Sequence, residues 1–398
     1  MNGKLDIRDE EILLLGLCRL SFDVELTIML RALAETVTDW QYFSSLANKH
    51  GVAALVYHNL ENLDFLRCVP KDYADLLHNS LMVNISRNAR NAEATASVLK
   101  RMNDEEIKIV LLKGLALELT VYGNMGLRQM TDVDVLATRD DCMKARRILM
   151  EYGFASLPVK SVLHKPLVAY TGKHLPTLTK DGFAIELHHE LFGSEQNILT
   201  KMLYENSRET DLNSTKTYIP QPQIFLLYLV KHLYLHEMNN ESQLRLYTDL
   251  VVLIEKYRDE IITYDLLSYA IQAGMEEILA WRLEPLRDLW GISFPEWMND
   301  FINKWYSPSS INKFIFFLKS PKDNPVENRA DRYRNNLKEI PGLHRKILYF
   351  VGDLFPTIEF MKKRYKCRSA WHTLLYYPLR WGKVWYLIRV QGLRGMRG

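Results

Sequence analysis

One stretch, residues 107–137, constrains the fold of this 398-residue chain more than any other part. It opens with an apolar, β-branched run at 107–112, whose length is typical of a buried strand. Lys113-Gly114 interrupts that run, and residues 115–119 have a helical composition. Residues 131–136 form a second strand candidate that carries two acids. The order of strand, turn, helix and acidic strand predicts a small mixed sheet with a site at one edge.

The two acids of the second strand are Asp132 and Asp134. Side chains alternate along a strand, so both carboxylates point to the same face, with Cα atoms about 6.5 Å apart. At that separation they can approach one Mg²⁺ or bridge two metal ions. Without a cation they repel each other. A bare Asp-x-Asp is more often a solvated strand end, so this alternative stays open.

A third acid, Glu186, lies in another strand candidate at 183–188, which follows turn residues at 180–182. By the same alternation, Glu186 and His188 share one face of the strand. If this strand lies beside the one that carries Asp132 and Asp134, the three carboxylates can form one metal site. Taken alone, Glu186 is more typical of an exposed strand residue.

Four segments of this region, taken together, resemble a known family. They are LLKGLAL at 111–117, YGNMGLRQMTDVDVLA at 122–137, the spaced pattern D-x-x-x-A-x-x-x-L-x-x-x-GF at 141–154, and IELHHEL at 185–191. The combination is similar to the uncharacterised nucleotidyltransferase family of the DNA-polymerase-β-like superfamily, over most of the chain. The resemblance implies catalytic, metal-binding roles for Asp132, Asp134 and Glu186, and it places Lys113-Gly114 against the nucleotide phosphates.

Three residues of this region are candidates for binding nucleotide. Gly114 gives the backbone room near a phosphate, and Lys113 can meet the β- and γ-phosphates as a point charge. The alternative for Lys113 is an ordinary surface lysine. Arg128 precedes Asp132 by four residues, and it can either clamp a phosphate in a bidentate manner or pair with an acid.

Histidines and a later arginine supply further candidates. His188 and His174 are expected to be structural or substrate-adjacent rather than metal ligands. His232 lies four residues before another histidine, without the H-E-x-x-H pattern of a metalloprotease. Arg245 is spaced to form a helix salt bridge with Asp249. The resemblance implies that these later helices flank the nucleotide cleft, so His232 and Arg245 are kept as nucleotide-binding candidates, together with His188 as a substrate-adjacent residue.

Composition narrows the class of protein. Apolar residues make up 47% and charged residues 25%, which is ordinary for a soluble globular protein. No apolar run approaches the ~20 residues of a transmembrane helix, and the N-terminus does not resemble a secretory signal. The four cysteines are scattered without a C-x-x-C pair, which favours free thiols in a reducing compartment. These features predict a cytoplasmic protein with no transmembrane segment, and a peripheral location at the membrane is the alternative.

Charge is distributed unevenly along the chain. Residues 341–398 contain 12 Lys and Arg against two acids, although the whole chain carries a net charge of only +3. Three tryptophans are mixed with these cations. This composition predicts contact with an anionic surface, such as a membrane or RNA. The alternative is a basic helix pair whose charges are solvated.

The periodicities predict an α+β protein, with a small mixed-sheet nucleotidyltransferase core flanked by N-terminal and C-terminal helical regions. We expect four regions, which are an N-terminal helical region at 1–105, the catalytic core at 106–215, a helical domain flanking the cleft at 216–305, and a basic, aromatic-rich region at 306–398. Within the core, 159–170 is expected to form a strand pair, and Thr138 to cap a helix that ends near Gly153.

The functional hypothesis is a metal-dependent nucleotidyltransferase that uses Mg²⁺ or Mn²⁺. It would move an NMP group from an NTP, with ATP as the default, to a hydroxyl acceptor with release of pyrophosphate. The acceptor can be a small molecule, a peptide or a protein. The rival hypothesis is a catalytically inactive, nucleotidyltransferase-like binding module that docks RNA or a membrane surface through its basic C-terminus.

Overall fold

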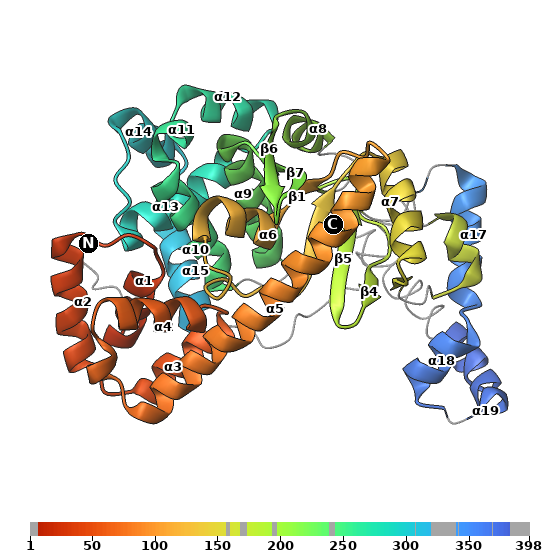
Figure 1. Cartoon of the computed structure of the whole chain (residues 1–398), viewed down its shortest axis with the longest axis horizontal. Helices are drawn as coiled ribbons and strands as arrows, with labels where there is room; N and C mark the ends of the chain where they lie inside the picture. Colours follow the sequence, from red (N-terminus) through yellow and green to blue (C-terminus); the bar gives the residue numbers. More distant parts are fainter. Residues whose placement is uncertain are drawn as a thin grey trace. The chain divides into compact units, whose positions relative to one another are not determined.

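The structure, a computed structural model, describes residues 7–156, 160–167, 173–192, 197–238, 243–306, 308–319, 340, 342–367 and 369–382 (Figure 1). The chain forms two compact units. The first comprises residues 1–135 and 198–326, and the second comprises residues 136–197 and 327–398. The predicted core at 106–215 therefore contributes to both units, and the strand that carries Asp134 continues from the first unit into the second.

Seven strands form a mixed sheet in the order β3-β4-β5-β2-β1-β7-β6. β1 and β7 are parallel, whereas the pairs β3–β4, β4–β5 and β6–β7 are antiparallel. The strands are β1 (Val110–Leu111), β2 (Val133–Leu136), β3 (Ala155–Ser156), β4 (Leu178–Lys180), β5 (Phe183–His188), β6 (Ser207–Leu212) and β7 (Thr215–Pro220). This sheet with its surrounding helices confirms the predicted α+β class.

The N-terminal part of the first unit is helical, as predicted. It contains α1 (Asp9–Leu17), α2 (Val24–Thr36), α3 (Trp40–Lys49), α4 (Ala53–Asn62), the 3₁₀ helix η1 (Leu66–Cys68) and α5 (Lys71–Asp104). The long helix α5 packs against α3, α4 and β7 (Figure 1). Two buried asparagines of α5 donate side-chain hydrogen bonds to the segment before β2, from Asn84 to Gly126 O and from Asn88 to Met125 O and Arg128 O. Helix α5 therefore holds the chain that leads into the acidic strand.

The later helices of the first unit are arranged around α9. They are α8 (Asn197–Glu205), α9 (Pro222–Met238), α10 (Leu244–Lys256), α11 (Arg258–Ile261), α12 (Tyr264–Gln272), α13 (Glu276–Trp290), α14 (Glu296–Lys304) and α15 (Pro308–Lys319). Every residue of 222–231 is buried, and α9 packs against α10, α11, α12 and α13. Pro222 is the first helical residue, as its fixed φ and missing N–H predict.

The second unit contains α7 (Arg139–Glu151), which packs on β5, and the C-terminal helices α17 (Leu343–Leu354), α18 (Ile358–Tyr365) and α19 (Ala370–Leu374). Thr138 caps α7 as predicted, because its hydroxyl accepts a hydrogen bond from Asp141 N–H. The predicted strand pair at 159–170 is wrong where the structure describes it, since 162–167 is the 3₁₀ helix η3 (Val162–Leu167) and packs on α17. The rest of that segment, other than 160–161, lies outside the described residues.

Two further findings bear on the predictions. The hairpin β6–β7 was not predicted, because its strands, SRETDL and TKTYIP, carry few apolar residues. Its turn, Asn213-Ser214, has positive φ angles of 48° and 61°, which asparagine tolerates better than most residues. None of the helices in the described residues is long and apolar enough to cross a membrane.

Candidate metal and nucleotide site

The backbone at the end of β1 places Lys113 beside β2. Leu112 N–H donates a hydrogen bond to Asp134 O at 2.9 Å, so the residue after Leu112 lies level with Asp134. All four residues of β2 are buried, and Asp134 is only 4% exposed. Lys113 then begins the short helix α6 (Lys113–Leu117) with a positive φ of 43°, a backbone conformation that is uncommon outside glycine.

Lys113 and Asp134 form a direct ion pair, in which Nζ lies 2.6 Å from Oδ1. Burial by itself lowers the pKa of Lys113, but the adjacent Asp134 carboxylate outweighs burial and raises that pKa above its usual value. The negative charge of Asp132 raises it further. Lys113 is therefore a cation held at the acidic strand, rather than a solvated surface lysine.

Strand β5 contributes two more side chains. Glu186 and His188 lie on one face, with Glu186 Oε2 3.5 Å from His188 Nε2, as the alternation of side chains predicts. Residues 173–177 run beside β5, since Leu175 N–H donates to Leu187 O. This places the Thr177 hydroxyl, which donates to Glu186 Oε1 at 2.9 Å, and the imidazole of His174 next to the same carboxylate.

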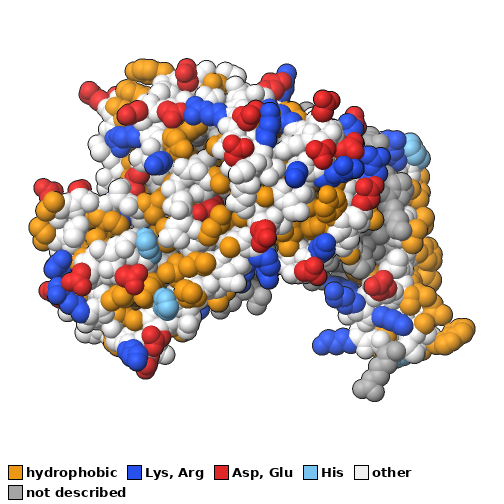
Figure 2. Space-filling view, in the orientation of Figure 1, with side chains coloured by type: hydrophobic (Ala, Val, Ile, Leu, Met, Phe, Trp, Pro, Cys, Tyr) orange, Lys and Arg blue, Asp and Glu red, His pale blue; other side chains and the backbone are white. Residues whose placement is uncertain are grey.

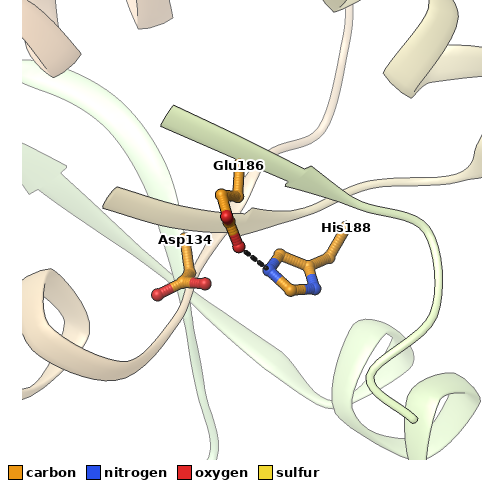
Figure 3. Close-up of side chains that lie close together, drawn as sticks. All are labelled: Asp134, Glu186 and His188. Atoms are coloured by element: carbon orange, nitrogen blue, oxygen red, sulfur yellow. Dashed lines mark ion pairs between the residues drawn. The ribbon is translucent and has the colours of Figure 1, made fainter. Parts of the chain in front are cut away.

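The structure brings Asp134, Glu186 and His188 together. Each offers one ligand atom, and these atoms lie within 4.8 Å of one another. Figure 3 shows the Asp134 and Glu186 carboxylates and the His188 ring converging from β2 and β5, which are neighbours in the sheet. Two carboxylates and one imidazole are a donor set that suits a divalent metal, and the nitrogen ligand favours Mn²⁺ more than Mg²⁺. The residues present therefore fit the metal that the sequence predicts.

This grouping differs from the predicted trio in one member. Asp132 does not belong to the cluster of ligand atoms, because β2 begins at Val133 and Asp132 therefore lies before the strand, where the alternation of side chains does not hold. Its side chain is half-buried and accepts a hydrogen bond from the Thr131 hydroxyl at 2.9 Å. His188, which was expected to be structural or substrate-adjacent, takes the third place.

Arg128 pairs with an acid, which is one of the two alternatives left open by the sequence. Its Nε and Nη2 donate to the two carboxylate oxygens of Asp249 at 2.7 and 2.6 Å, and the Tyr122 hydroxyl donates to the same carboxylate at 3.0 Å. Arg128 and Asp249 are 5% and 1% exposed. The bidentate pair fixes the segment before β2 to helix α10, and the predicted Arg245–Asp249 salt bridge is wrong because Arg128 occupies that carboxylate.

Arg245 instead contacts the backbone of the same segment. Its Nη1 donates to Gln129 O and its Nη2 donates to Gln243 Oε1 at 3.0 Å. Burial lowers the pKa of Arg245 to about 10, and the neighbouring Arg128 charge lowers it as well. The side chain remains charged at neutral pH, and the charge of Asp132 acts on it favourably.

Gly114 is packed rather than open. A Cβ atom at this position would lie 2.6 Å from the side chain of Met130 and 2.8 Å from Arg128 Nη1. The predicted reason for a glycine was room for a phosphate, whereas the structure shows that the space is needed for the Arg128 and Met130 side chains.

His232 lies on α9, half-buried, with its ring stacked 6.1 Å from that of Tyr228. The phenol group of Tyr228 is close enough to Lys113 to contribute to the raised pKa of that lysine, so α9 faces this site.

Sequence patterns do not predict the parts that Tyr122, Glu118 and Asp249 have in this site. Glu118 is 2% exposed, and burial raises its pKa to about 7, although Arg128 opposes this shift. Asp249 was noticed only as a helix neighbour of Arg245. Its true partner precedes it by 121 residues, and no local spacing points to such a pair.

Comparison with known proteins adds one family. Residues 36–291, more than half of the chain, match the family described as uncharacterised nucleotidyltransferase. The matched segment contains Lys113, Asp134, Glu186 and His188, and it ends at Gly291, the left-handed residue that follows α13. No curated protein matches the chain.

Proposed function

The chain belongs to the uncharacterised nucleotidyltransferase family, and on this premise we propose that it transfers a nucleotidyl group in a metal-dependent reaction. An acceptor hydroxyl oxygen attacks the α-phosphorus of an NTP, the bond from that phosphorus to the α–β bridging oxygen breaks, and pyrophosphate leaves with the electron pair. The observation that carries the proposal is the convergence of Asp134, Glu186 and His188 in a sheet position where Lys113 is also held.

Each side chain has a role that follows from its position. Asp134, Glu186 and His188 would hold Mn²⁺ or Mg²⁺, which when bound neutralises charge on the triphosphate. Lys113, which pairs with Asp134, would balance the phosphate charge. Asp132, half-buried and directly before β2, would contact the bound metal–nucleotide complex, and Glu186 would accept the proton of the attacking hydroxyl.

Pyrophosphate release tests this function. Wild-type protein is incubated with Mn²⁺ or Mg²⁺, each of ATP, GTP, CTP and UTP, and cell extract as the pool of acceptors. We expect release with at least one NTP, and a loss of about a hundredfold or more in Asp134→Asn. Asp140→Asn, which changes an exposed acid on α7, is the matched control and should keep wild-type activity. No release by the wild type with any NTP would contradict the proposal.

A second candidate function, docking on an anionic membrane surface, is favoured by an exposed apolar face in the second unit. Trp371, Leu375 and Leu379, at four-residue spacing, are 82%, 70% and 60% exposed. Lys362, Lys363, Arg364 and Lys366 lie in and just after α18, which packs against α19. In Figure 2, hydrophobic side chains lie at the surface of the part that Figure 1 labels α17, α18 and α19, and Lys and Arg side chains lie near them. Exposed tryptophan and leucine beside cations fit the interface of an anionic bilayer.

Vesicle sedimentation tests the docking surface. We expect the full chain to pellet with vesicles that contain phosphatidylglycerol and to stay in solution with pure phosphatidylcholine. Trp371→Ala should weaken this binding at least fivefold, whereas Tyr264→Ala, which removes an exposed aromatic ring of the first unit, should not. Binding of RNA without binding of either vesicle would overturn the assignment to membrane.

A further inference from the structure

The first unit contains a cavity of about 230 Å³ that the reaction described above does not use. It is bounded by α3, α4, α5 and the segment before β2, and its lining includes Asn48, Gly51, Asn79, Ser80, Arg87 and Gln129. Ligand cavities for drug-sized molecules are typically about 300–1,000 Å³. This cavity therefore suits a small molecule and is too small for a second nucleotide.

The lining has polar groups that the protein itself does not satisfy. Within the described residues, the Arg87 guanidinium has no ion pair or hydrogen bond, and neither do the side-chain amides of Asn79 and Gln129. Ser80 and Asn48 are joined to each other through the Ser80 hydroxyl, at 3.1 Å. No acid belongs to the lining. The cavity thus offers a cation and several neutral donors and acceptors.

Two contacts shape the wall that faces Gln129. Gly51 has a φ of +69°, and a Cβ atom there would lie 2.8 Å from Gln129 Oε1. The same Cβ position is 3.5 Å from Arg245 Nε, a buried atom without a hydrogen-bond partner in the described part of the chain. A glycine with a left-handed backbone therefore keeps the cavity open between the Gln129 amide and a second guanidinium.

Arg245 also connects this wall to the catalytic acids. Its Nη1 donates to Gln129 O, and its charge interacts with that of Asp132. Gln129 itself precedes Asp132 by three residues. Arg245 therefore contacts a lining residue of the cavity and also acts on Asp132, so the cavity lies near the acids that the second substrate of a transfer reaction must reach.

We propose that this cavity binds the anionic end of the acceptor, a small molecule that carries an oxyanion, either phosphate or carboxylate, in addition to the hydroxyl that is nucleotidylated. Arg87 pairs with the oxyanion, because a guanidinium matches two oxygens of such a group. The amides of Asn79 and Gln129 bind its polar substituents. This assignment rests on the proposed function, and it names the class of the acceptor, which the family and the metal site leave open.

Calorimetric titration of the full chain tests the cavity without turnover. The two probes are inorganic phosphate and succinate, which separate a phosphate-bearing from a carboxylate-bearing acceptor. We expect one of them to bind the wild type with a millimolar Kd. Arg87→Gln should weaken that binding at least tenfold and Arg87→Lys by a smaller factor. Arg90→Gln, which changes an exposed arginine of the same helix, should leave it unchanged.

Three outcomes would overturn the assignment. They are an absence of binding of both probes to the wild type, equal binding to the wild type and Arg87→Gln, and displacement of the bound probe by ATP, which would make the cavity part of the nucleotide site. Asp134→Asn should retain the anion affinity of the wild type. A failure of pyrophosphate release is thereby distinguished from a failure of the acceptor cavity.

Discussion

Lys113 Nζ lies 2.6 Å from Asp134 Oδ1, and the carboxylate in this pair belongs to a buried strand. The hydrogen bond from Leu112 N–H to Asp134 O fixes the two backbones at the same level, so the ion pair follows from the register of the sheet. The Lys113 ammonium group held at this point neutralises the Asp134 carboxylate, and it lies at the proposed position of the nucleotide phosphates. The pair thus links the fold directly to the proposed chemistry.

Removal of the Lys113 charge tests that link. We expect Lys113→Met to weaken NTP binding about tenfold, which corresponds to about 1.4 kcal/mol, because a phosphate loses its charge partner. Lys144→Met, which alters an exposed lysine of α7, is the control and should bind as the wild type does. Calorimetry with a non-hydrolysable NTP measures both. Equal affinity in Lys113→Met and wild type would show that Lys113 serves only Asp134.

The Arg128–Asp249 pair should contribute to stability through its burial. Arg128→Met leaves the Asp249 carboxylate buried with only the Tyr122 hydroxyl as a partner, and we expect a loss of about 3–5 kcal/mol. The double variant Arg128→Met/Asp249→Leu should lose less than the sum of the single variants. Arg101→Met, in an exposed pair with Asp104, should change stability by less than about 1 kcal/mol.

Denaturant unfolding of the wild type, Arg128→Met, Asp249→Leu and the double variant gives the coupling energy, with Arg101→Met as the control. Additive losses in the two single variants and the double variant would show that the two side chains do not act as a pair. If the nucleotide affinity of Arg128→Met also falls, the Arg128–Asp249 pair positions residues 128–134 for nucleotide binding.

His50 should make stability depend on pH. Burial lowers the pKa of His50 from 6.5 to about 4, while its ring accepts a hydrogen bond from Leu244 N–H and contacts Leu318 O. The folded pKa lies below the unfolded value, so the stabilisation is complete above pH 6.5 and is lost as the pH falls toward 4. The full shift corresponds to about 3 kcal/mol.

Thermal unfolding between pH 7 and pH 4.5 measures this effect. The wild type should lose stability over that interval, and His50→Gln should lose less of it because the variant has no group to protonate at this position. An identical pH dependence in both proteins would contradict the assignment to His50.

Side-chain alternation and turn chemistry predicted a large part of the site. Period-2 alternation placed Glu186 and His188 on one face, and the Lys113-Gly114 break placed a cation at the end of a buried strand. The same alternation indicates that His188 can join Glu186, whereas the alternation of Asp132 with Asp134 and the family resemblance favour Asp132 as the third ligand.

Other features could not be predicted, because they depend on contacts between distant segments. The partner of Arg128 lies in α10, and the true constraint on Gly114 is the packing of Arg128 and Met130. The strands of the β6–β7 hairpin are polar and show no apolar alternation. The segment at 162–167 was expected to be a strand, although its apolar residues pack as a 3₁₀ helix against α17.

The central claim is that Asp134, Glu186 and His188 bind one divalent metal ion. Titration of the protein with Mn²⁺, followed by electron paramagnetic resonance of the free ion, tests it directly. We expect one site in the wild type and in Asp140→Asn, and a loss of affinity of at least tenfold in Asp134→Asn and in His188→Gln. Equal Mn²⁺ binding in all four proteins, or no binding in the wild type, would contradict it.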